Sequence, residues 1–247
     1  MKTQIFRFLF VLFVTGLTLS GWGIYREMRP NWEAEKHYKV LQEQIVIPDI
    51  PLGADADTEF QEEQVIDFDE LQKSIPDLVA WIYGPGTAIH YPVVQGIDNE
   101  YYLEHLADLA KNRNGAIFMD YRNSADFSDF LSILYGHHIR GGRMFSSLEN
   151  YRTQEYYEEH PVLYLFTRQS SYEIRIFAGV VMDADSEFFP LGINFEDREE
   201  WLSDLRQRSS FNADLEPDPN GRFIALCTCT YEYSNARYVV YGQIEES

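Results

Sequence analysis

Apolar residues follow a different pattern in each part of the chain. Residues 8–25 read FLFVLFVTGLTLSGWGIY and contain no charged residue. As a helix at ~1.5 Å per residue this run would span about 27 Å, close to the hydrocarbon thickness of a bilayer. Helical spacing then predicts one helix over 32–46 and a short helix over 68–73 that Pro76 closes. The stretch 48–65 mixes proline, glycine and acids, which predicts a linker.

From Leu78 onward the apolar runs become short, rich in Val, Ile, Tyr and Phe, and bounded by Gly, Pro, Asn or Asp, as strands are. Eight such runs cover 78–83, 88–94, 116–120, 131–137, 162–167, 172–181, 223–230 and 238–244. Their number and spacing predict a mainly β fold, either a closed barrel or a sandwich, with a few inserted helices. Helices are predicted at Glu100 to Leu109, Met144 to Glu159 and Phe195 to Arg208.

The amino-acid composition excludes several classes of protein. An apolar fraction of 45% is ample for a packed core, which excludes a disordered chain. Two cysteines are too few for a disulfide scaffold or a cysteine-rich zinc module. The formal net charge is -20, and only one of the 40 acids lies in the first 29 residues. A domain this acidic repels phosphate, so no nucleic-acid partner is expected.

The amino-terminal apolar run has two interpretations. Thr18 and Ser20 are small enough to form a weak signal-peptide cleavage site. The run is longer than a usual signal core, and Trp22 and Tyr25 lie where interfacial aromatic residues are expected. Length and flanking residues favour an uncleaved anchor over a cleaved signal peptide.

This interpretation divides the chain into three parts. Residues 1–29 form a cytoplasmic tail and transmembrane anchor, 30–70 an amino-terminal helix and linker, and 71–247 the working β domain. No second apolar run of similar length follows, so a single-pass membrane protein is predicted.

Three residues at predicted strand ends have the chemistry of a nucleophilic site. Cys229 lies near the end of one strand, Arg237 begins the next, and His137 ends another. A short loop between antiparallel strands brings Cys229 and Arg237 to one end of the fold. A thiolate can attack a carbonyl, an imidazolium can protonate a leaving amine, and a guanidinium can stabilise an oxyanion. The alternative remains open that the cysteine is a small buried apolar residue and the histidine a solvated loop residue.

Other polar clusters do not suggest further chemistry. His138 follows His137 directly, so in a strand the two rings point to opposite faces and do not chelate one metal. The acids at 62–63 and 196–200 are typical of solvated faces, and 55–59 lack the ligand spacing of a calcium loop. No phosphate-binding or dinucleotide motif is present. We therefore expect no metal and no cofactor.

Four segments resemble segments of class B sortases, and they occur along the chain in the order expected for that family. LCTCTYEYSNARYVVYG (226–242) resembles the catalytic strand pair of that family, and ILYGHHIRGGRMFSSL (133–148) its histidine segment. Residues 75–106 and NGAIFMDYRN (114–123) resemble further family segments. The resemblance runs from about residue 71 to 244 and is more specific than any single motif.

The resemblance implies a fold and a set of site residues. The family fold is a closed eight-stranded β-barrel with amino-terminal helices and a long helix between strands six and seven. Cys229 matches the nucleophile, His137 the catalytic histidine and Arg237 the essential arginine. The family usually has serine two residues before the nucleophile, whereas this chain has Cys227. Positions expected to line the groove for the sorting motif are Asn99, Leu103, Tyr135 and Thr228, the last through its backbone near the oxyanion.

The resemblance also implies a membrane-anchored cysteine transpeptidase, a thiol endopeptidase outside a Gram-positive cell. It would cleave the carboxy-terminal sorting motif of a surface protein after Thr, keep the acyl group as a thioester, and pass it to a peptidoglycan cross-bridge amine. Two alternatives stay open. One is a pilin-polymerising sortase that uses a pilin lysine, and the other is a non-catalytic scaffold, which would lack at least one of the three site residues.

Overall fold

A computed structural model of the chain describes residues 2–45, 47, 66–139, 141–183, 197–229 and 236–246. The chain divides into two compact units, residues 1–41 and 42–247. The linker predicted over 48–65 lies outside the described residues.

The first unit consists of most of the long helix α1, Lys2–Glu43. The predicted anchor and the helix predicted over 32–46 belong to this one helix, which continues through Pro30. An ion pair joins Arg29 to Glu33 at 2.7 Å, across the turn that contains the proline. The large apolar side chains of its first half are exposed, and the helix is long and apolar enough to cross a membrane. A helix with this surface suits a lipid environment better than water.

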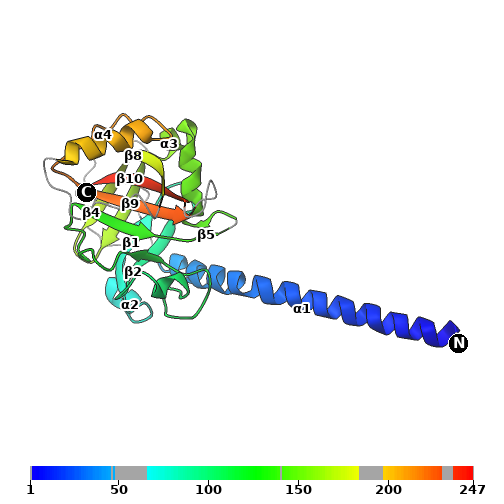
Figure 1. Ribbon diagram of the computed structural model, residues 1–247. Coiled ribbons are helices and arrows are strands. Elements are labelled where there is room, and N and C mark those ends of the chain that lie inside the picture. The colour runs from blue at the N-terminus through cyan, green and yellow to red at the C-terminus, as the bar shows by residue number, and fades with distance from the viewer. Residues whose placement is uncertain are drawn as a thin grey trace. The chain divides into compact units, whose positions relative to one another are not determined.

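The second unit contains a closed barrel of eight strands in the order β1-β2-β3-β4-β9-β10-β8-β7 (Figure 1). Six neighbouring pairs are antiparallel, while β2–β3 and β4–β9 are parallel. The closed eight-stranded barrel is therefore confirmed, and the sandwich is excluded. The barrel strands are β1 Leu78–Tyr83, β2 His90–Gln95, β3 Ile117–Met119, β4 Leu131–Tyr135, β7 Val162–Thr167, β8 Ser171–Asp183, β9 Arg222–Cys229 and β10 Ala236–Glu246.

Each barrel strand coincides with one of the eight predicted apolar runs. These runs form strands because β-branched, aromatic and other large apolar residues pack into the barrel, as do Leu163 and Leu165 of β7, which are fully buried. A small hairpin that was not predicted, β5 His138–Ile139 with β6 Arg143–Met144, follows β4. Its strands are two residues long, too short to give an alternating pattern.

Helix α4, Arg198–Arg208, packs on β8 beside the barrel (Figure 1). It lies between β8 and β9, the sixth and seventh barrel strands along the chain. Leu202 and Leu205 are its buried residues, and they join a cluster with Phe177, Phe223 and Tyr241 from the barrel. The predicted helix began at Phe195, but residues 184–196 lie outside the described part of the chain.

The helix predicted over Glu100 to Leu109 is wrong. The described structure there has only one 3-10 turn, η1, Tyr101–Leu103. The Asp98 carboxylate accepts hydrogen bonds from the backbone N–H groups of Glu100 and Tyr101 at 2.9 and 2.8 Å, and these compete with helical bonds. Leu109 has a positive φ of 69°, which no α-helix permits.

The helix predicted over Met144 to Glu159 is divided into two. A 3-10 segment, η2, covers Phe145–Arg152, and α3 covers Gln154–Glu159. Thr153 between them is extended and caps α3, because its hydroxyl accepts the N–H of Tyr156 at 3.4 Å. The short helix α2, Phe68–Gln72, confirms the prediction over 68–73, and Asp67 caps it.

We expect Gly242→Ala to destabilise the barrel. The pairing of β10 with β8 shifts register between Tyr241 and Gly242, and a Cβ on Gly242 would lie 2.3 Å from Ile174 Cγ2 and 3.3 Å from the Arg175 carbonyl oxygen. The free energy of unfolding should fall by about 1–3 kcal/mol, measured by urea denaturation of the full chain in detergent. The exposed residue Glu246 on the same strand gives the control, since Glu246→Ala should change stability by less than about 0.5 kcal/mol. An unchanged unfolding free energy for Gly242→Ala would contradict the expectation.

Candidate active site

Three neighbouring strands build one ordered face of the barrel. Tyr135 of β4 pairs with Cys227 of β9, which pairs with Val239 of β10. In the preceding row of paired residues, Ile133 of β4 pairs with Ala225 of β9, which pairs with Tyr241 of β10. Most of these side chains belong to the apolar cluster that α4 helps to cover. This packing fixes the register of all three strands.

The predicted catalytic residues lie at the ends of the same three strands or just beyond them. Cys229 pairs with Arg237, which confirms that the two lie on adjacent antiparallel strands at one end of the fold. The parallel β4 ends at Tyr135, and the Gly136 N–H donates to the Cys227 carbonyl at 3.0 Å, which keeps the chain beside β9. His137 lies two residues past Tyr135 on this side of β9, just as Cys229 lies two residues past Cys227, the partner of Tyr135. The Cys229 side chain lies outside the described part of the chain.

His137 lies just beyond β4, not in the strand as predicted, and a backbone carbonyl holds its ring. The Nε2 atom lies 2.7 Å from the Leu103 carbonyl oxygen. Because a carbonyl only accepts hydrogen bonds, Nε2 carries a hydrogen and donates it. Nδ1 is then the ring atom that can take up or release a proton. His138 belongs to β5 instead, where it pairs with Met144.

The carbonyl that holds His137 is itself fixed. Tyr102, its neighbour in η1, is fully buried, and its hydroxyl donates to Asp77 at 2.6 Å. Its carbonyl accepts the Ala116 N–H at 3.0 Å. Gly115 has a positive φ of 61° and brings its backbone against both Tyr102 and the His137 ring. The position of the His137 ring thus depends on Gly115, a residue to which the sequence alone assigned no role.

Arg237, Cys227 and Thr228 have different environments. The Arg237 side chain is half-buried, and its Nη1 donates to the Ala236 carbonyl at 3.1 Å. Cys227 is a thiol outside any disulfide, 2% exposed, within the cluster beneath α4. Thr228 is 1% exposed, so any contact it makes with a bound peptide must come from its backbone.

Two predicted groove residues are joined by a carboxylate that sequence reasoning missed. Asn99 Nδ2 and the Tyr135 hydroxyl each donate to Asp120 Oδ2 at 3.0 Å. Arg122 donates to both oxygens of the same carboxylate, from Nε at 2.8 Å and Nη2 at 2.7 Å. Leu103 is exposed and contributes the carbonyl that holds His137. Asp120 lies within the family-like segment 114–123, but the sequence assigns it no role because Asn99 and Tyr135 are 21 and 15 residues away.

The surroundings of Asp120 determine its charge. Burial raises its pKa, but the hydrogen bonds from Arg122, Asn99 and Tyr135 outweigh burial and hold the pKa below its ordinary value. Burial and the adjacent Asp120 carboxylate raise the pKa of Tyr135. The pair is therefore an ionised carboxylate that accepts from a protonated phenol.

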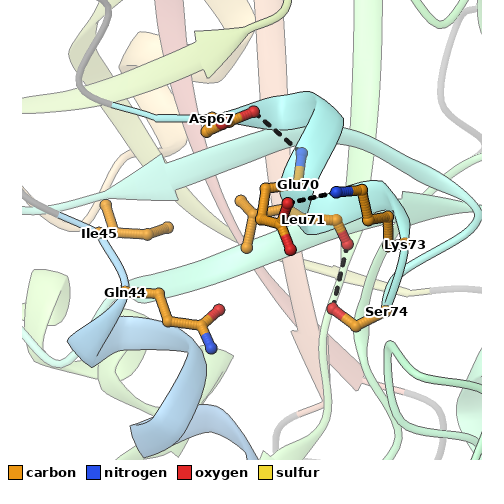
Figure 2. Close-up of a pocket in the computed structure, with 7 residues that line it drawn as sticks. All are labelled: Gln44, Ile45, Asp67, Glu70, Leu71, Lys73 and Ser74. Carbon is orange, nitrogen blue, oxygen red and sulfur yellow. Dashed lines mark hydrogen bonds and ion pairs between the residues drawn. The ribbon is translucent and has the colours of Figure 1, made fainter.

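A concavity of about 320 Å³ lies between the residues that follow α1 and the helix α2, away from the candidate catalytic residues (Figure 2). Its polar groups bond to one another: Lys73 pairs with Glu70, and the Ser74 hydroxyl donates to the Leu71 carbonyl at 3.1 Å. The lining has neither a thiol nor an imidazole. Within the described residues no three His, Cys, Asp or Glu side chains are grouped as metal ligands.

Comparisons with known proteins agree with this architecture. A family model for the sortase domain matches residues 82–245. Sortase B of Listeria monocytogenes is 34% identical over 239 residues, with 94% of each chain covered. A Staphylococcus aureus sortase B–substrate complex superposes with a TM-score of 0.73 at 28% identity, over 87% of this chain and 98% of that one. Clostridium perfringens sortase B gives a TM-score of 0.68 at 31% identity, over 72% and 100%.

We expect Gly115→Ala to displace His137 and lower activity. A Cβ there would lie 2.5 Å from the Tyr102 carbonyl oxygen and 2.8 Å from His137 Cδ2, at a φ that disfavours side chains. A displacement of about 1 Å can reduce kcat/KM by about 10²-fold, measured as acylation by a reactive peptide.

Gly86→Ala is the matched control for this substitution. Gly86 also has a positive φ, of 71°, and its Cβ would also lie 2.8 Å from a histidine ring, that of His160. His160 is no candidate for catalysis, so this variant should keep its activity. An equal loss in both variants would mean that backbone strain, not the position of His137, lowers activity.

Proposed function

The chain belongs to the sortase family of cysteine transpeptidases, in class B, and on that premise we propose that Cys229, His137 and Arg237 form its catalytic set. The observation that carries the proposal is the register at one end of the barrel. Cys229 pairs with Arg237, and His137 follows the strand on the other side of β9 with its Nε2 held by the Leu103 carbonyl. A non-catalytic scaffold would not need this combination.

The first half of the proposed reaction forms a thioester. The Cys229 thiolate attacks the carbonyl carbon of the scissile peptide bond, and the Arg237 guanidinium stabilises the oxyanion of the tetrahedral intermediate. The carbon–nitrogen bond then breaks, and the His137 imidazolium gives its Nδ1 proton to the departing amine. The products are an acyl-Cys229 thioester, a free amine and a neutral imidazole.

The second half transfers the acyl group. An acceptor amine attacks the thioester carbonyl, and Nδ1 of the neutral His137 takes its proton. The carbon–sulfur bond breaks, which restores the thiolate–imidazolium pair. Without an amine, water resolves the thioester in the same way, so slow endopeptidase activity accompanies transpeptidation.

The partners follow from the same proposal. The donor is a surface protein whose carboxy-terminal sorting motif is cleaved after Thr, and the acceptor is a peptidoglycan cross-bridge amine, with a pilin lysine as the alternative. Asn99, Leu103, Tyr135 and the backbone of Thr228 line the groove for the motif. Helix α1 anchors the chain in the cell membrane by one pass, with residues 71–247 extracellular. The exposed apolar surface of α1 supports the membrane anchoring, and the extracellular side follows from membership of the family.

The direct test is covalent capture. We expect the full chain in detergent, incubated with a library of candidate sorting peptides, to gain the mass of an acyl group on Cys229. Cys229→Ala should form no adduct. Cys227→Ser should form it at nearly the wild-type rate, because Cys227 is a buried neighbour in the cluster under α4.

Two outcomes would contradict this assignment. An acyl adduct on Cys227 in the wild type, or any adduct in Cys229→Ala, would place the nucleophile elsewhere. Adding the cross-bridge peptide or a pilin lysine peptide to the loaded enzyme then separates the two acceptors by the mass of the product.

Arg237→Lys should lose most activity although the positive charge is kept. A guanidinium presents a rigid fork of donors, whereas an ammonium is a compact point charge. Loss of one oxyanion donor corresponds to about 2.7–4 kcal/mol in kcat/KM. The measurement is peptide transpeptidation, with the fold checked by circular dichroism. Near wild-type turnover in a folded variant would remove Arg237 from the proposed set.

A further inference from the structure

The buried Asp120 carboxylate lies at the junction of two segments of the proposed groove. It follows β3 directly, and its side chain is fully buried. Through a single oxygen it holds Asn99 from the loop before η1 and Tyr135 from the end of β4. The two groove residues come from different parts of the chain, and this carboxylate bonds to both.

The bond to Asp120 determines which way the Asn99 amide faces. A carboxylate only accepts, so Nδ2 must be the atom that faces Asp120. Independently, the Tyr121 backbone N–H, which only donates, lies 3.1 Å from Asn99 Oδ1. The two constraints agree and exclude the flipped amide. The second Nδ2 hydrogen has no partner among the described residues and remains as a donor.

The same carboxylate determines the role of the Tyr135 hydroxyl. Because Asp120 Oδ2 accepts, the phenol hydrogen points to it, and the hydroxyl can meet any other group only as an acceptor. The ring packs against Phe118 with centroids 5.3 Å apart, so the hydroxyl has little freedom to rotate away.

Arg122 explains why a carboxylate is stable at this buried position. Its guanidinium bonds both carboxylate oxygens, and its backbone N–H donates to Oδ1 at 3.0 Å. An ionised side chain with this many donors avoids the cost of an unpaired buried charge. The neutral amide of an asparagine would bring its own donors to a site where every partner donates.

We propose that Asp120 is a positioning residue that fixes the hydrogen-bond polarity of the groove, so that Asn99 presents an N–H and Tyr135 a hydroxyl oxygen to the bound sorting peptide. An extended peptide offers carbonyl oxygens, which can accept from the Asn99 N–H. It also offers N–H groups, which can donate to the Tyr135 hydroxyl oxygen. The inference rests on the proposed function only in taking a sorting peptide as the ligand.

The test is Asp120→Asn, which keeps the size of the side chain and changes its polarity. We expect KM for an acylating peptide to rise about tenfold, while kcat changes less than about threefold, since the groups lost bind substrate and do not react. The rate at which iodoacetamide alkylates Cys229 should stay within about twofold of wild type, because the reagent does not use the groove.

Asp129→Asn is the matched control. Asp129 is also a loop-holding carboxylate between β3 and β4, accepting from the Ser124 N–H at 2.6 Å and Asn123 Nδ2 at 3.0 Å. It contacts neither Asn99 nor Tyr135, so its loss should leave KM unchanged. If Asp129→Asn raises KM as much as Asp120→Asn, both carboxylates only hold the loop, and the proposal is overturned.

A second background tests whether Asp120 acts through its two partners. In a chain carrying Asn99→Ala and Tyr135→Phe, Asp120→Asn should raise KM by less than about twofold, since the groups that it orients are absent. A full tenfold effect in that background would contradict the proposal. If Asp120→Asn does not fold because Arg122 is left unpaired, the double variant Asp120→Asn, Arg122→Gln replaces it in each comparison.

A third measurement does not depend on any substrate. The side-chain amide signals of Asn99, assigned by their loss in Asn99→Ala, should shift in the NMR spectrum of Asp120→Asn and exchange faster with water. Unchanged signals would overturn the inference even if peptides acylate the enzyme. If no peptide acylates the wild type but the signals shift, the proposed function fails while the role of Asp120 in orienting Asn99 stands.

Discussion

The register of β9 between a parallel and an antiparallel neighbour is the constraint on which the candidate site depends. One strand meets β4 on one side and β10 on the other, and apolar rows under α4 fix both alignments. A slip by one residue on either side would bury the wrong face and separate His137 or Arg237 from Cys229. Cys229, His137 and Arg237 are therefore aligned by the packing of apolar side chains that lie one or two rows away along the same strands.

A second layer holds the site through backbone atoms. The His137 ring is held by the Leu103 carbonyl, and that carbonyl belongs to a segment fixed by a buried tyrosine and pressed against Gly115. A carbonyl partner determines which ring nitrogen carries hydrogen without adding charge. The side of the proposed groove is different, because a full carboxylate with an arginine counterion bonds to the two polar groups there.

The sequence predicted what short-range patterns encode. All eight barrel strands follow from short apolar runs rich in β-branched and aromatic residues and bounded by turn residues, and the ends of β9 and β10 predicted the pairing of Cys229 with Arg237. The helix predicted over 100–109 failed because Asp98 competes for backbone N–H groups, a preference that apolar spacing does not reveal. Asp120 and Gly115 were missed because their roles depend on partners distant in sequence. The family resemblance supplied the residue roles, which periodicity alone left open.

The closure of the barrel has a consequence under the membrane anchoring by α1 proposed above. Copies held on one membrane meet often, and unpaired strand edges are the sites where folded β proteins adhere to one another. Each of the eight barrel strands has a neighbour on both sides. Among the described residues, only the two-residue strands of the small hairpin leave edges open. Crowded copies would thus meet through side chains, many of them acidic, and repel one another.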